Sequence, residues 1–123
     1  MKKILLIEDD MELNKAYGMI LKQDKYDVKS AYNGDDGMQI LENFKPDLIL
    51  LDLIMPVKSG LEFLEEYSSK KTKLPKVLII TNLENSNEIT KALTFGGLKC
   101  VVKSHTTPQG LRKIVRTTLA DKD

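Results

Sequence analysis

Residues 46–60 read PDLILLDLIMPVKSG, and this stretch decides what kind of fold the chain can adopt. Its apolar run, residues 48–51, is continuous rather than alternating. Such a run is typical of a strand that is covered on both faces, as in a parallel sheet. The run ends at a carboxylate, Asp52, and a loop with Pro56 and Gly60 follows. The stretch therefore predicts a buried parallel strand with an acidic residue at its carboxyl end.

Four further short apolar runs lie on either side of this strand, at residues 4–7, 28–32, 77–80 and 100–102. The runs at 4–7 and 77–80 are rich in Ile, Leu and Val and nearly continuous, so they predict two more buried strands. The run at 28–32 alternates apolar and polar residues, so we expect it at an edge of the sheet.

Segments with helical periodicity separate and follow these runs. The first has apolar residues at i, i+3, i+4, i+7 and i+8, namely Leu13, Ala16, Tyr17, Ile20 and Leu21. Residues that favour the start of a helix precede all five segments: Asp10, Asn33, Ser59, Asn85 and Thr107. Strand and helix alternate five times, which predicts an α/β doubly wound parallel sheet with right-handed crossovers.

The bulk composition fits one domain that spans residues 1–123. Nineteen basic and eighteen acidic residues give a net charge of +1, which argues against a protein that coats nucleic acid or a membrane surface. A single cysteine, Cys100, excludes an internal disulfide and suits a reducing compartment. No apolar run reaches the length of a membrane span, and the run at 4–7 is too short for a signal peptide. We therefore expect a cytoplasmic protein.

Carboxylates follow two of the predicted strands: Glu8-Asp9-Asp10 after the first and Asp52 after the third. In open α/β sheets, ligands bind beyond the carboxyl ends of the strands. If these two strands are neighbours, the carboxylates repel one another unless a hard cation such as Mg²⁺ or Mn²⁺ binds between them. Alternatively, the acidic residues only favour the positive start of the next helix. We adopt that interpretation for Asp10, and metal binding for Glu8 and Asp9.

Thr81 ends the fourth apolar run and Lys103 follows the fifth. Either residue alone would indicate no more than capping or solubility. Together with the carboxylates they form a coherent set: a carboxylate nucleophile, a metal, and two donors for phosphoryl oxygens.

The order of these motifs resembles the receiver domain of two-component response regulators, the CheY-like superfamily, over essentially the whole chain. The matching pieces are ILLIEDD (4–10), PDLILLDLIMPVKSG (46–60), VLIIT (77–81), ALTFGG (92–97) and VVK (101–103). The resemblance implies a flavodoxin-like sheet of five strands in the order 2-1-3-4-5, with five helices.

The resemblance also implies a mechanism. Asp52 would accept a phosphoryl group from a histidine kinase or phosphotransfer protein. Asp9, Asp52 and the backbone carbonyl of Ile54 would bind Mg²⁺, with Glu8 acting mostly through water. Thr81 and Lys103 would bind the phosphoryl oxygens, and a downstream protein would bind the face formed by the fourth helix, fifth strand and fifth helix.

Three positions depart from the family pattern. Asn82 stands where the family usually has a small residue, and it could narrow the entrance to the site. Ser104 replaces a proline that usually follows the lysine in a cis peptide. Cys100 occupies a position where the family often has a switching aromatic ring, so we expect a small buried residue there.

The function that these observations favour is a phosphorylatable switch, not an enzyme acting on a separate substrate. The alternative is a pseudo-receiver, an interaction module that binds partners without phosphorylation, but its usual sign is the loss of an acidic residue or the lysine. A hydrolase on a similar sheet would need a Ser/Cys–His pair or a glycine-rich phosphate loop, and the sequence has neither. The chain would be a stand-alone receiver or a fragment of a longer regulator.

Overall fold

The computed structural model describes residues 1–70, 75–82 and 87–120, except for the side chains of Leu98 and His105. Asn85, the expected cap of the fourth helix, lies outside these residues. The strands are β1 (Lys3–Ile7), β2 (Asp27–Ala31), β3 (Leu48–Leu51), β4 (Lys76–Thr81) and β5 (Gly97–Val102). The helices are α1 (Met11–Gln23), α2 (Gly34–Ile40), α3 (Gly60–Lys70), α4 (Asn87–Thr94), the short 3₁₀ turn η1 (Lys103–His105) and α5 (Pro108–Ala120).

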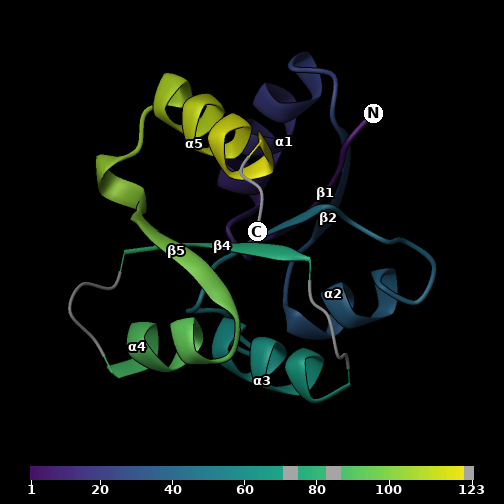
Figure 1. The fold of residues 1–123 in the computed structure, drawn as a ribbon, viewed down its shortest axis with the longest axis vertical. Helices are drawn as coiled ribbons and strands as arrows, with labels where there is room; N and C mark the ends of the chain where they lie inside the picture. Colours follow the sequence, from purple (N-terminus) through teal and green to yellow (C-terminus); the bar gives the residue numbers. More distant parts are fainter. Residues whose placement is uncertain (71–74, 83–86, 121–123) are drawn as a thin grey trace.

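The five strands form one parallel sheet in the order β2-β1-β3-β4-β5. This confirms the doubly wound α/β fold and the edge position of the alternating strand β2. Helices α1 and α5 cover one face of the sheet, while α2, α3 and α4 cover the other (Figure 1). None of the helices in the described part of the chain is long and apolar enough to cross a bilayer.

Each face of the sheet has its own hydrophobic core. Leu5 and Ile7 of β1 point to the core under α2, α3 and α4, whereas Ile4 and Leu6 point to the core under α1 and α5. All four side chains are fully buried. Burial on both faces explains why the sequence of β1 is a continuous apolar run.

Local side-chain hydrogen bonds define where several helices begin. The Asp10 carboxylate accepts from the backbone N–H groups of Glu12 and Leu13, which confirms Asp10 as the N-cap of α1. Ser59 and Glu62 exchange two hydrogen bonds of 3.1 Å, so the predicted capping box at α3 is also confirmed. These caps fix the directions in which the loops after β1 and β3 enter the helices.

The buried face of α1 differs in one respect from the prediction. Tyr17 and Leu21 are buried as expected, but Ala16 is exposed, and Asn14 is buried instead. The apolar pattern did not register Asn14 because its amide is polar. Its burial is explained by two hydrogen bonds to strand ends, described below.

Candidate functional site

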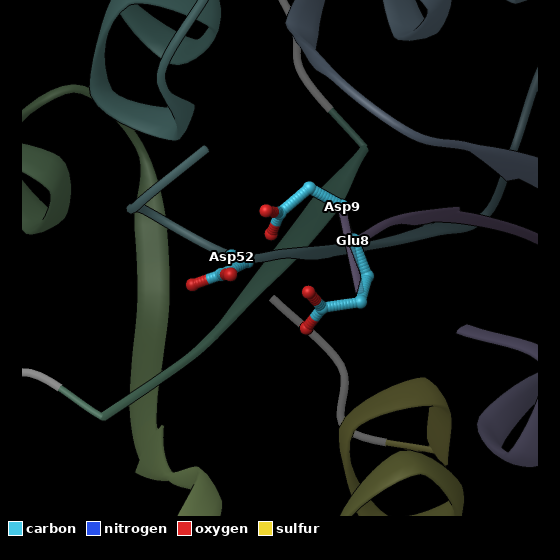
Figure 2. Close-up of side chains that lie close together, drawn as sticks. All are labelled: Glu8, Asp9 and Asp52. Atoms are coloured by element: carbon cyan, nitrogen blue, oxygen red, sulfur yellow. The ribbon is translucent and has the colours of Figure 1, made fainter. Parts of the chain in front are cut away.

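The acidic residues predicted from the sequence meet at the carboxyl ends of β1 and β3. Ile7 and Leu51 are register partners, and the backbone N–H of Asp52 donates to the carbonyl of Ile7 at 3.1 Å. This pairing brings Glu8 and Asp52 to neighbouring positions. The side chains of Glu8, Asp9 and Asp52 converge on one space, with one carboxylate oxygen of each within 4.8 Å of the others (Figure 2).

The three carboxylates differ in how deeply they are buried. Glu8 is fully buried, Asp52 is 3% exposed, and Asp9 is partly exposed. One oxygen of Glu8 accepts the backbone N–H of Asp10 at 3.0 Å. One oxygen of Asp52 accepts the backbone N–H of Ile54 at 3.3 Å. Glu8 and Asp52 therefore lie deep in the site, whereas Asp9 lies nearer its surface.

Lys103 reaches this cluster from the carboxyl end of the edge strand β5, where η1 begins. Its Nζ lies 2.8 Å from Oδ2 of Asp52 and 2.6 Å from Oε1 of Glu8. The contact with Glu8 is a close ion pair between a fully buried carboxylate and an ammonium. The ammonium thus bridges two carboxylates from different strands.

The carboxylates in this cluster outnumber the ammonium groups. Burial raises the pKa of Glu8 to about 7, although the hydrogen bonds from Lys103 and Asp10 oppose this rise. Burial would lower the pKa of Lys103, but the neighbouring Asp52 and Glu8 carboxylates outweigh it and leave the pKa raised. Lys103 is therefore a firmly charged cation, and Glu8 needs further positive charge nearby to stay fully ionised at neutral pH.

A cleft opens over this cluster, and all of the site residues predicted from the sequence line it. Thr81, at the end of β4, is fully buried, and the Ile54 side chain is 56% exposed at the rim. Asp10 and Asn82 also reach the cleft. The lining residues are Glu8, Asp9, Asp10, Asp52, Ile54, Thr81, Asn82 and Lys103.

The donor set of the cleft suits a small divalent cation. Three carboxylates face a single ammonium, so when all are ionised the group keeps an excess of negative charge. Hard oxygen donors of this kind match Mg²⁺ or Mn²⁺. The convergence of the three carboxylates and the partial exposure of Asp9 are consistent with such an ion.

Asn14 supports the site from below, and the sequence analysis did not identify it. Its side-chain amide donates to the backbone carbonyls of Glu8 and Ala31, both at 3.0 Å. It therefore ties the carboxyl ends of β1 and β2 to the first turn of α1. The sequence does hold a sign of this role, because Asn14 is a polar residue on the helix face that also carries Tyr17 and Leu21.

Gly60 supports the site from the other side of Asp52. Its backbone N–H donates to the carbonyl of Leu53 at 3.0 Å. A Cβ at this position would lie 2.0 Å from the backbone carbonyl oxygen of Asp52. Only glycine fits there, which gives a physical reason for the glycine four residues beyond Pro56.

The chain belongs to the response regulator receiver domain family, whose model matches residues 4–116. The fold and the acidic cluster described above are those expected of that family.

Several solved structures share this fold. A CheY-like receiver domain protein from Methanospirillum hungatei is 24% identical with a TM-score of 0.88, over 97% of this chain and 94% of that one. The BeF₃-activated N-terminal receiver domain of RstA from Klebsiella pneumoniae is 26% identical with a TM-score of 0.85, over 98% and 100% of the two chains. Chemotaxis protein CheY4 of Vibrio cholerae is 23% identical with a TM-score of 0.87, over 96% and 98%.

Proposed function

We propose that this protein is a phosphoacceptor switch in which Asp52 receives a phosphoryl group from a histidine kinase or phosphotransfer protein. The observation that carries the proposal is the environment of Asp52: a nearly buried carboxylate at the base of an open cleft, with the Lys103 ammonium at 2.8 Å. A carboxylate that served only the fold would not need to face a cleft.

The chemistry is a displacement at phosphorus. A carboxylate oxygen of Asp52 forms a bond to the phosphorus of the donor as the bond from phosphorus to the histidine nitrogen breaks, which leaves an acyl phosphate on Asp52. The Lys103 ammonium and the Thr81 hydroxyl border the same cleft and can donate to the phosphoryl oxygens. Lys103 would then exchange part of its contact with Asp52 for a contact with the phosphoryl group.

We propose that Asp9, Asp52 and the backbone carbonyl of Ile54 hold a Mg²⁺ or Mn²⁺ ion, with Glu8 contributing mostly through water. The ion would neutralise charge between the Asp52 carboxylate and the incoming phosphoryl group. The proposal rests on the converging carboxylates of Glu8, Asp9 and Asp52 and on the hard oxygen donors they supply.

We further propose that a downstream protein binds the face formed by α4, β5 and α5. Both Thr81 and Lys103 lead directly into these elements along the chain. Cys100 lies half-buried on β5 against the core and has no ring to rotate, so the signal would travel through the loops after Thr81 and Lys103. Nothing at the site favours the pseudo-receiver alternative, because the acidic residues, Asp52 and Lys103 are all present.

The decisive experiment is incubation with acetyl phosphate or phosphoramidate and Mg²⁺, followed by intact-mass measurement. We expect the wild-type protein to gain one phosphoryl group and Asp52→Asn to gain none. Asp10→Asn is the matched control, since Asp10 caps α1 and should not accept phosphate. Labelling should also disappear when a chelator removes the metal. Labelling of Asp52→Asn, or none of the wild type, would contradict the proposal.

A further inference from the structure

Two of the positions that depart from the family pattern contact each other. Oδ1 of Asn82 accepts a hydrogen bond from the backbone N–H of Ser104 at 3.0 Å. A proline at position 104 would have no N–H to donate, so the contact requires a residue other than proline there. The two departures, which look unrelated in the sequence, form a single structural unit that we call the Asn82–Ser104 latch.

The latch lies just beyond the last register pair of β4 and β5. That pair is Thr81 and Val102, and the residues that follow them in sequence are Asn82 after β4 and Lys103 after β5. The two groups proposed to bind phosphoryl oxygens, Thr81 and Lys103, therefore directly precede the two residues of the latch along the chain. A side chain thus continues the connection between β4 and β5 after the backbone pairing stops.

The latch also gives a hydrogen-bond acceptor to the Ser104 N–H, which has no partner within the 3₁₀ turn η1. Lys103 begins the 3₁₀ turn η1, which closes through a 3.1 Å hydrogen bond from the N–H of Thr106 to the carbonyl of Lys103. The first N–H groups of a helical turn have no partner within the turn. No side-chain cap is supplied by Val102, the residue before η1. Asn82 supplies this cap from the neighbouring strand end.

We propose that Asn82 is a positioning residue that acts through Lys103. By capping η1 it fixes the backbone from which the Lys103 side chain extends, and so holds the ammonium on Asp52 and Glu8. The proposal rests on the function proposed above for Asp52 and Lys103. It adds a residue on the β4 side that orients a group on the β5 side.

The variant Asn82→Leu tests this directly, because leucine branches at Cγ as asparagine does and has no acceptor. We expect the Ser104 amide proton to exchange about two- to tenfold faster in this variant, as for the loss of one exposed hydrogen bond. The Lys103 ε-methylene signals should shift as well. Ser104→Ala is the matched control, since it keeps the N–H. The protection of the amide at position 104, relative to its intrinsic exchange rate, and the Lys103 signals should stay the same. Asn82→Asp keeps an acceptor oxygen and should keep the Ser104 amide protected.

The effect on chemistry is measured as the rate of phosphorylation by acetyl phosphate. We expect Asn82→Leu to slow it by about three- to tenfold, because a mispositioned donor lowers the rate. In a Lys103→Met background the same substitution should have no further effect, since the two residues act as one unit. A merely structural role would lower the rate equally in both backgrounds.

Three results would overturn the inference: an unchanged Ser104 amide, an unchanged phosphorylation rate, or an Asn82→Leu effect that persists in full without Lys103. Failure of the proposed function looks different. In that case the wild-type protein gains no phosphoryl group at all, and the Ser104 amide and Lys103 signals still decide whether the latch positions Lys103.

Discussion

The two sides of the cleft are built in different ways. On the acidic side, β3 is buried along its whole length and β1 along all but its first residue, so the carboxylates project from a rigid floor. On the basic side, Lys103 extends from β5, whose described side chains are only half-buried. The pairing of β4 with β5 also contains a register shift next to Val77. The acidic side is thus the more tightly packed of the two. If Asp52 is phosphorylated as proposed above, movement of the basic side would cost less.

The most disruptive test of the acidic side is Gly60→Ala. The added Cβ would meet the Asp52 carbonyl oxygen, a backbone atom that cannot turn away. We expect the free energy of unfolding in urea to fall by about 3–5 kcal/mol. Gly18→Ala in α1 is the control, because its Cβ would meet nothing nearer than 4.0 Å. That variant should be up to about 1 kcal/mol more stable than the wild type, and a similar loss in both variants would contradict the packing argument.

A pair of truncations compares the two sides more directly. Leu50→Ala in β3 removes a fully buried side chain and should lower the free energy of unfolding by about 2–5 kcal/mol. Val101→Ala in β5 removes a half-buried one and should lower it by about 1 kcal/mol. Equal losses, measured by urea denaturation, would mean that β5 is as rigidly packed as β3 and that the contrast between the two sides is wrong.

Asn14→Leu tests the support beneath the acidic side. The variant leaves the Glu8 carbonyl without the amide that Asn14 provides, whereas the Ala31 carbonyl keeps its hydrogen bond from the Glu8 N–H. One buried acceptor without a partner should lower the free energy of unfolding by about 1–3 kcal/mol. Asn43→Leu, at an exposed position, should change it by no more than about 0.5 kcal/mol.

The smallest effect is expected at Val57, in the loop between Asp52 and α3. Its φ of 67° places a β-branched residue in the left-handed region, which costs about 1–3 kcal/mol. Val57→Gly should therefore raise the free energy of unfolding by about 1 kcal/mol, after allowing for the entropy of glycine. Lys25, with φ of 71°, is unbranched at Cβ and less strained, so Lys25→Gly should raise the free energy of unfolding by less than Val57→Gly does. A destabilised Val57→Gly variant would show that this loop stores no strain.

The sequence predicted the parts of this structure that depend on local pattern. Continuous apolar runs identified the buried strands, and Asp10 and Ser59 marked helix starts because capping is a contact between near neighbours. The convergence of Glu8, Asp9, Asp52, Thr81 and Lys103 on one cleft followed from their places at strand ends.

What the sequence could not predict depends on contacts between distant residues. The burial of Asn14 follows from two carbonyls on other elements, and the bond between Asn82 and Ser104 joins residues 22 positions apart. The left-handed backbone of Val57 was also missed, because valine normally avoids that region. In each case a tertiary contact or loop closure decided the local structure against intrinsic preference.

The ion pairs of Lys103 also bear on how the chain folds as it is made. Glu8 follows β1, the first strand of this sheet to be synthesised, and Lys103 follows β5, the last, so the ammonium arrives only after the rest of the sheet has been synthesised. Until then, Glu8 and Asp52 lack the Lys103 ammonium that contacts them in the finished fold. Contacts that span so much of the sequence require the closure of long loops and make folding slower. The cleft is therefore a feature of the completed sheet, and a nascent chain that stops before β5 would lack it.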